Sequence, residues 1–232
     1  FLDVNYGGRK HRKAIDVAVL KHLTTTLLHL QRRNALITSC DAKACYDRII
    51  PIALSLAQIQ AGLPINAAQF FLRTLNEMEY YMITSYGPTQ TGIKSTSRYP
   101  IYGTGQGATD APPNWTLLAN ACQKAYEKYS KGCKIVDPTG TIVQQAPGKM
   151  FVDDKNLMHN GQKSNPTAEE LMTYVTHDVT LWDRYIWITG GLIECLKTKY
   201  SLMIWKFENT GAPMITLENE LPPNTVRINQ PD

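Results

Sequence analysis

The sequence has few residues of the kinds that build disulfide frameworks, zinc sites or membrane spans. Its 232 residues include five cysteines, with no Cys-x-x-Cys pair, and five histidines. Scattered cysteines predict reduced thiols and an intracellular protein, because disulfide-rich domains and zinc sites space their cysteines in pairs. No apolar run approaches the roughly 20 residues that cross a bilayer, so we expect no membrane partner. The N-terminal residues also lack the basic-then-apolar order of a signal peptide.

The net charge is only +4, but the basic residues are concentrated near the N-terminus. Residues 1–50 contain nine Lys or Arg against four Asp or Glu. Within them, Arg9, Lys10, Arg12 and Lys13 form a run suited to binding the phosphates of a nucleic acid. The alternative for such a run is a solvated entrance to a helix.

The apolar pattern predicts an α+β fold in which the strands mostly return antiparallel. A capping box of Thr167 and Glu170 marks the start of one helix, and Asn66 is the expected cap of another. Helices are expected over residues 13–33, 51–61, 64–75, 112–130 and 168–188. Strands are expected over residues 35–40, 80–85, 97–102, 134–136, 141–143, 149–152, 156–159 and 200–207.

Three carboxylates stand at the ends of predicted strands. Asp41 follows the strand at 35–40, and Asp153 and Asp154 fall in the tight turn of a later hairpin. Taken singly, each is ordinary turn or cap chemistry. Three that converge would repel one another unless cations held them. All-oxygen ligation without a histidine cluster then favours two Mg²⁺ ions, with Mn²⁺ as a substitute.

Four segments, taken together, resemble the motifs of reverse transcriptases. They are DAKACYDRI at 41–49, YGTGQGATDAPPNW at 102–115, MFVDD at 150–154, and the paired glycines, lysine and WKF within 190–207. The match is most similar to retrotransposons without long terminal repeats or related eukaryotic mobile elements. It implies a right-hand polymerase palm with an antiparallel sheet and partial helical fingers, truncated before the thumb. The implied activity is RNA-directed DNA synthesis, with an RNA template, a DNA primer and dNTPs as partners.

The resemblance also implies the catalytic and metal-binding residues. Asp41, Asp153 and Asp154 correspond to the catalytic aspartates that hold two metal ions, with the carbonyl of Ala42 as a further ligand. Lys197 corresponds to the lysine that lies near the triphosphate and protonates the leaving pyrophosphate.

The nucleotide-binding residues implied by the same motifs are Ala42, Tyr46, Gln106 and Gly107. The ring of Tyr46 would lie under the incoming sugar and exclude a 2′ hydroxyl. Gln106 and Gly107 would contact the template and the nucleotide, where a missing side chain lets a base pair approach the backbone.

The resemblance divides the chain into five parts. They are partial fingers with a first helix at 1–34, a first palm segment at 35–62, a return through the fingers at 63–100, the main palm segment at 101–207 and a C-terminal extension at 208–232. No thumb, RNase H or endonuclease motif follows, so the chain resembles an excised core.

Two departures from the family pattern concern template binding, whereas the alternative of a non-catalytic remnant rests on the truncation alone. Ala111 precedes Pro112 where the family has a serine, and Asp110 adds a negative charge to a loop expected to face nucleic acid. The alternatives are a non-catalytic nucleic-acid-binding remnant and an RNA-dependent RNA polymerase. The second is disfavoured by Tyr46 and by Phe-Val before the aspartates, where viral replicases commonly have glycine.

Overall fold

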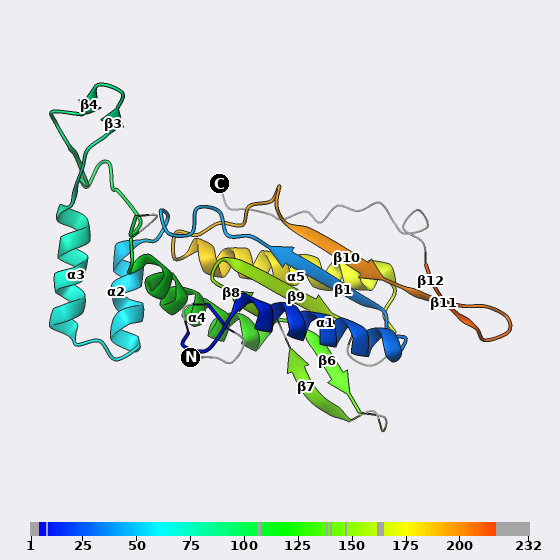
Figure 1. Ribbon diagram of the computed structural model, residues 1–232. Helices are drawn as coiled ribbons and strands as arrows, with labels where there is room; N and C mark the ends of the chain where they lie inside the picture. The colour runs from blue at the N-terminus through cyan, green and yellow to red at the C-terminus, as the bar shows by residue number, and fades with distance from the viewer. Residues whose placement is uncertain are drawn as a thin grey trace.

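A four-stranded antiparallel sheet forms the centre of the molecule, with strand order β10-β1-β9-β8 (Figure 1). This computed structural model describes residues 5–7, 9–105, 108–137, 139, 141–146, 148–161 and 165–216. The central strands are β1 (Ala35–Cys40), β8 (Gly148–Phe151), β9 (Asp154–His159) and β10 (Lys199–Met203). The predicted α+β fold with antiparallel strands is confirmed.

Three helices cover the two faces of this sheet. Leu36 and Cys40 of β1 belong to the main core with α4 and α5, whereas Ala35 packs in a smaller cluster with Leu28 of α1. Since side chains of a strand alternate between faces, α1 and the α4–α5 pair must lie on opposite faces. Figure 1 shows α1 in front of the sheet and α5 behind it. The bounds are α1 (Ala14–Leu30), α4 (Ala111–Tyr129) and α5 (Ala168–Trp187).

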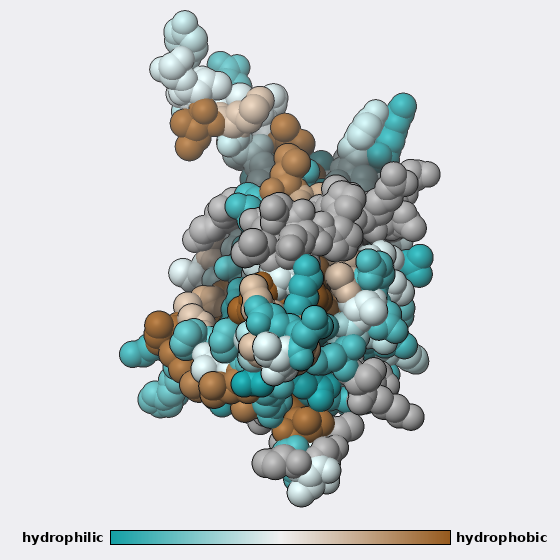
Figure 2. All heavy atoms as spheres, turned by 90° about the vertical axis from the view of Figure 1, so that its right-hand side faces the viewer, coloured by the Kyte–Doolittle hydropathy of each residue, from teal (hydrophilic) through white to brown (hydrophobic). Residues whose placement is uncertain are grey.

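Helix α1 buries little of its own surface. Val17 and Leu28 are its buried residues. Its exposed apolar side chains are Ile15, Val19, Leu23 and Leu30. Figure 2 shows hydrophobic atoms in brown along its left edge, which is the α1 side of the molecule. None of the helices in the described part of the chain is long and apolar enough to span a membrane.

Residues 51–94 form an arm beside the sheet. It contains α2 (Pro51–Gln60), α3 (Ile65–Glu77) and four short strands. The strands are β2 (Glu79–Tyr80), β3 (Ile83–Thr84), β4 (Gly87–Pro88) and β5 (Ile93–Lys94), paired as β2 with β5 and β3 with β4.

Three predictions in and beside this arm are wrong. The strand predicted at 80–85 divides into β2 and β3, which pair with different strands. Asn66 is not the cap of α3, because the carbonyl of Pro64 already accepts the first helical bonds from Ala67 and Ala68. Residues 97–102 do not form a strand either. The backbone N–H of Thr96 donates to the carbonyl of Tyr99, and the Tyr99 N–H donates to the Thr96 hydroxyl. This local turn competes with strand pairing.

The remaining strands form two hairpins outside the central sheet. The predicted hairpin of β6 (Cys133–Val136) and β7 (Ile142–Ala146) is confirmed. The single strand predicted at 200–207 is wrong, because it divides into β10 and β11 (Trp205–Phe207). Ala35, the first residue of β1, pairs with Met203, so β10 has no partner beyond that point. The chain then pairs β11 with β12 (Pro213–Ile215).

Candidate functional site

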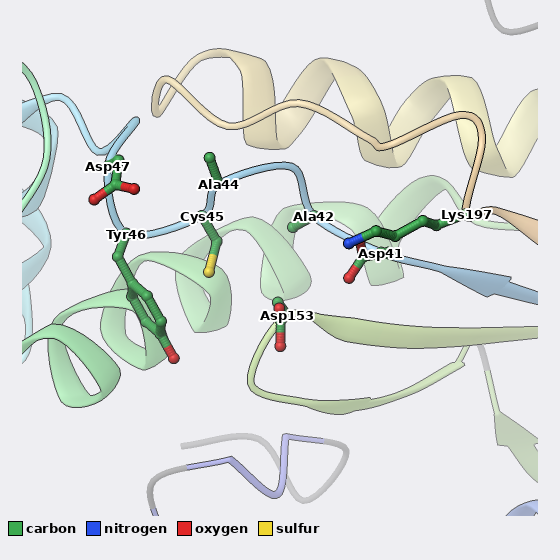
Figure 3. A pocket seen from close by; sticks show the side chains of 8 residues that line it. All are labelled: Asp41, Ala42, Ala44, Cys45, Tyr46, Asp47, Asp153 and Lys197. Carbon is green, nitrogen blue, oxygen red and sulfur yellow. The ribbon is translucent and has the colours of Figure 1, made fainter. Parts of the chain in front are cut away.

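A cavity of about 270 Å³ lies where the end of β1 meets the β8–β9 turn and the loop before β10 (Figure 3). Five of the residues predicted for the site line this cavity. They are Asp41, Ala42, Tyr46 and Asp153 from the aspartate motifs, and Lys197. The wall is completed by Ala44, Cys45 and Asp47, which were not predicted although they lie within the run DAKACYDRI. The structure therefore brings residues of three distant motifs into one cavity.

Backbone hydrogen bonds to the loop before β10 hold Asp41 in place. The Asp41 carbonyl accepts the N–H of Glu194, and Ala42 pairs antiparallel with Ile193. The same loop carries Lys197, whose Nζ lies 3.1 Å from Asp41 Oδ2. Figure 3 shows this lysine reaching toward Asp41. The Asp41 side chain is 19% exposed and that of Lys197 is 71% exposed, so the lysine can swing away at little cost.

Asp153 is positioned by a strained turn that neighbouring residues hold. The turn residues are Val152 and Asp153, and Asp154 is already the first residue of β9, so Asp154 does not share the turn as predicted. Val152 has φ 56°, an uncommon conformation for a β-branched residue. Its carbonyl accepts the indole N–H of Trp115 at 2.8 Å, and Gly7 packs directly on its backbone.

Asp154 lies beside the cavity but does not line it. Cys40 pairs with Lys155 in the β1–β9 register, and continuing that register by one step sets Asp41 opposite Asp154. Because successive side chains alternate, Asp41 and Asp154 lie on the same face as Ser39 and Asn156, the pair two residues further inward.

The acidic residues of the site repel one another. Burial raises the pKa of Asp153, and the carboxylates of Asp154 and Asp41 raise it further. Burial and Asp41 likewise raise the pKa of Asp154. Asp41 raises the pKa of Lys197, mainly by accepting its hydrogen bond, so this lysine is protonated at neutral pH. Burial first, and then Asp153 and Asp41, raise the pKa of the Cys45 thiol to about 12.

The oxygen atoms of these carboxylates suit a hard divalent cation, but they do not form a complete coordination sphere. Within the described ranges, no group of three or more His, Cys, Asp or Glu side chains could hold a metal ion. The raised pKa values of Asp153 and Asp154 show that their negative charges are destabilised, and a divalent cation bound by their oxygens would relieve that. The residues therefore fit Mg²⁺, provided that Lys197 releases Asp41.

Tyr46 lies at the opposite end of the cavity from Lys197 (Figure 3). Its carbonyl accepts the N–H of Thr104, and the Ile49 carbonyl accepts the N–H of Gly103. Gly103 has φ 97°, and a Cβ there would meet the backbone of Asp47 at 2.6–2.7 Å. The first glycine of GTGQG thus allows this loop to pack on the turn that carries Tyr46. Gln106 and Gly107 lie outside the described residues.

The paired glycines support the same turn from its other side. Gly190 has φ 95°, and a Cβ there would collide with the carbonyl oxygen of Arg48. The Nε of Arg48 donates to the Gly190 carbonyl at 2.9 Å. The N–H of Ile50 donates to the carbonyl of Thr189. The glycine motif therefore lets the end of α5 pack against the turn that follows Asp41.

The basic run near the N-terminus does not line the cavity. Lys10, Arg12 and Lys13 are exposed, and Arg9 donates to the carbonyl of Asn5. The guanidinium of Arg12 lies 4.8 Å from the centre of the Tyr6 ring. These residues precede α1, on the side of the molecule where residues 5–7 lie against β8 and Val152.

Comparisons with known proteins give a fold. No protein-family model matches the chain, and no curated protein does. Similar solved structures include apo telomerase from Candida tropicalis truncated from its C-terminal domain, with TM-score 0.55, 13% identity, and coverage of 92% of this chain and 41% of that one. Telomerase from the same organism with the TWJ fragment of telomeric RNA matches with TM-score 0.55 and 10% identity. That match covers 86% of this chain and 30% of the telomerase chain. A further structure of apo telomerase from Candida tropicalis matches with TM-score 0.53 and 11% identity, and covers 85% of this chain and 33% of the telomerase chain.

The chain thus spans less than half the length of these telomerase structures, and the sequence identity is low. The chain has a reverse transcriptase-like fold, similar to that of these telomerase structures.

Proposed function

We propose that this chain is the core of an RNA-directed DNA polymerase, encoded by a retrotransposon without long terminal repeats or a related eukaryotic mobile element. Its partners are an RNA template, a DNA primer and dNTPs, and it acts inside the cell. The observation that carries the proposal is that Asp41, Asp153, Tyr46 and Lys197, from three of the four polymerase-like motifs, line one cavity. The division into palm, fingers and C-terminal extension stays a prediction.

Asp41, Asp153 and Asp154, with the carbonyl of Ala42, would hold two Mg²⁺ ions. When bound, such ions activate the primer hydroxyl and neutralise charge on the leaving pyrophosphate. The protein residues supply the rest of the site. The ordinary pKa of Lys197, 10.5, lies well above neutral and the contact with Asp41 raises it further, so the released lysine still has a proton to donate to the leaving pyrophosphate.

The other predicted residues select and hold the substrates. Tyr46 lines the cavity, and its ring would oppose the 2′ hydroxyl of a ribonucleotide. Arg9, Lys10, Arg12 and Lys13 would bind phosphates of the template or primer. One structure in the comparison contains telomerase with RNA, which supports an RNA partner for this fold. Contacts of Gln106 and Gly107 with the template and nucleotide stay a prediction.

Primer extension tests the proposal. Because the chain spans less than half of the matched telomerases, we expect it to bind primer–template weakly and extend it little by itself. A longer protein that adds the flanking reading frame should extend a DNA primer on an RNA template with Mg²⁺. Asp153→Asn in that protein should abolish extension, because a neutral amide does not offset the charge of divalent ions.

The second candidate is a nucleic-acid-binding remnant without catalysis. It is favoured by the ion pair of Lys197 with Asp41, and by Asp154 lying outside the cavity lining. Tight binding of an RNA–DNA hybrid by the longer protein, with no extension in Mg²⁺ or Mn²⁺, would establish it in place of the polymerase.

A further inference from the structure

A lysine of α1 makes a polar contact with both strands that lead to the acidic residues. Lys21 Nζ donates to Asn156 Oδ1 of β9 at 2.8 Å and to Ser39 Oγ of β1 at 3.1 Å. Ser39 Oγ also donates to Asn156 Oδ1 at 2.9 Å. The three groups close a triangle, called here the Lys21 triangle, that joins α1, β1 and β9.

The triangle lies directly behind the candidate metal ligands. Ser39 and Asn156 face each other in the β1–β9 register. Ser39 lies two residues before Asp41 and Asn156 two residues after Asp154, so all four side chains emerge from the same face of the sheet. Any change in the relative position of β1 and β9 at the triangle would be transmitted to the pair of carboxylates one step further along.

Among the described residues, helix α1 buries few of its own side chains. Val17 and Leu28 are its buried residues, and Leu28 packs at the far end of the helix against Ala35 and Met158. Lys21 lies between them in the sequence, is partly buried, and contacts β1 and β9 through Ser39 and Asn156. The Lys21 triangle is therefore the polar contact that holds the middle of α1 to the two strands.

We propose that Lys21 is a positioning residue for the metal-binding carboxylates, acting through Ser39 and Asn156. The inference rests on the proposed function, because it takes Asp41 and Asp154 as ligands of divalent ions. Residues that orient metal ligands from behind typically change metal affinity by 10- to 100-fold when they are substituted.

Electrostatics alone predicts the opposite sign, which makes the inference testable. A lysine near a divalent cation repels it, so removing that charge should strengthen metal binding. Loss of positioning should weaken binding. The direction of the change therefore separates a lysine that orients the ligands from one that is only a nearby charge.

The experiment measures Mn²⁺ binding to the 232-residue chain by electron paramagnetic resonance, with no substrate or turnover. Lys21→Met should weaken Mn²⁺ binding by about tenfold, and Lys21→Arg, which retains donors for Ser39 and Asn156, should recover most of it. Lys128→Met is the matched control, an exposed lysine of α4 whose loss should leave binding unchanged. Circular dichroism reports whether each variant is folded.

Unchanged or tighter binding by folded Lys21→Met would overturn the inference while leaving the proposed function intact. No Mn²⁺ binding by the unsubstituted chain would overturn the metal site, and with it both proposals. If Lys21→Met does not fold, Ser39→Ala decides, since it removes one side of the triangle and keeps the charge. A weakening of about threefold would support positioning, and wild-type binding would refute it.

Discussion

Lys155, the residue after Asp154, is a buried lysine on the opposite face of β9, and its ionisation offers a direct test of the fold. Its side chain is 1% exposed, and its Nζ lies 3.8 Å from the centre of the Tyr126 ring and 3.4 Å from that of the Trp182 ring. It also donates a hydrogen bond to Gln123 Oε1. Burial lowers the pKa of this lysine well below its ordinary value of 10.5, against nearby thiols and acids that raise it.

The lowered pKa fixes the sign of a pH effect. Between the native pKa and 10.5, the unfolded chain binds a proton at Lys155 that the native chain does not. Stability therefore rises with pH over this window, by about 1.4 kcal/mol for each pH unit. Lys155→Met removes this dependence, and Met suits the site because it is unbranched and contacts aromatic rings favourably.

The absolute stability of Lys155→Met is a balance of two effects. Replacing a buried ionisable group by an apolar side chain is neutral or stabilises by about 1–4 kcal/mol. Leaving the acceptor of Gln123 without its donor costs about 1–3 kcal/mol. These two effects oppose each other, so they do not fix whether the variant is more or less stable than wild type. The change of that stability difference with pH does have a fixed sign, in favour of wild type as pH rises.

The assay is urea unfolding of both proteins at a series of pH values below 10.5, and wild type should gain stability on the variant as pH rises between the lowered native pKa of Lys155 and 10.5. Burial raises the pKa of the Cys122 thiol to about 11 and that of Cys40 to about 12, so their contributions to stability are lost as pH rises above their unfolded value of 9.0. Both proteins share this loss, so it cancels. A flat difference would show that the two rings keep Lys155 charged and would refute the reasoning.

Three other expectations concern acid stability, packing and substrate choice. Burial opposes ionisation of Asp178, but the hydrogen bond from His159 and others outweigh it and lower its pKa to about 2. At pH values above 3.8, the ordinary pKa of an aspartate, ionised Asp178 therefore stabilises the fold by about 2 kcal/mol, and this contribution is lost as pH falls toward 2. Asp178→Asn should remove this part of the stability change in an acid titration followed by fluorescence. Gly190→Ala should cost about 3 kcal/mol in thermal unfolding because a Cβ meets Arg48, whereas Gly62→Ala, at φ 101° in open space, should cost about 1 kcal/mol; equal costs would contradict the packing. In the longer protein, Tyr46→Val should incorporate ribonucleotides more readily and Tyr46→Phe should not, and unchanged sugar discrimination in Tyr46→Val would assign the ring to the core.

The parts of the fold that were predictable from sequence depend on local signals. The strand that ends at Asp41 and the hairpin around Asp153 follow from short apolar runs that end at turn residues. Helix α5 begins where the capping box of Thr167 and Glu170 was predicted, and both of its hydrogen bonds are present. In each case the residues that decide the structure lie within a few positions of one another.

The errors concern pairings set by distant residues. A strand over residues 97–102 looked plausible, but the Thr96 hydroxyl offers the backbone a competing local bond. The division after Met203 depends on where β1 begins, which is a contact between residues far apart in sequence. The Lys21 triangle is hidden for the same reason, since no local pattern links Lys21 to Asn156, 135 residues away.

Single-nucleotide incorporation on an RNA template by the longer protein tests the central claim most directly. Asp41→Asn is compared with Asp47→Asn, a matched carboxylate that lines the same cavity at the end away from Asp153 (Figure 3). The account predicts that Asp41→Asn loses incorporation by about a thousandfold or more, the scale of loss when a catalytic electrostatic group is removed, while Asp47→Asn keeps it within about tenfold. Equal activity of Asp41→Asn and wild type would contradict the assignment of this cavity as a polymerase site.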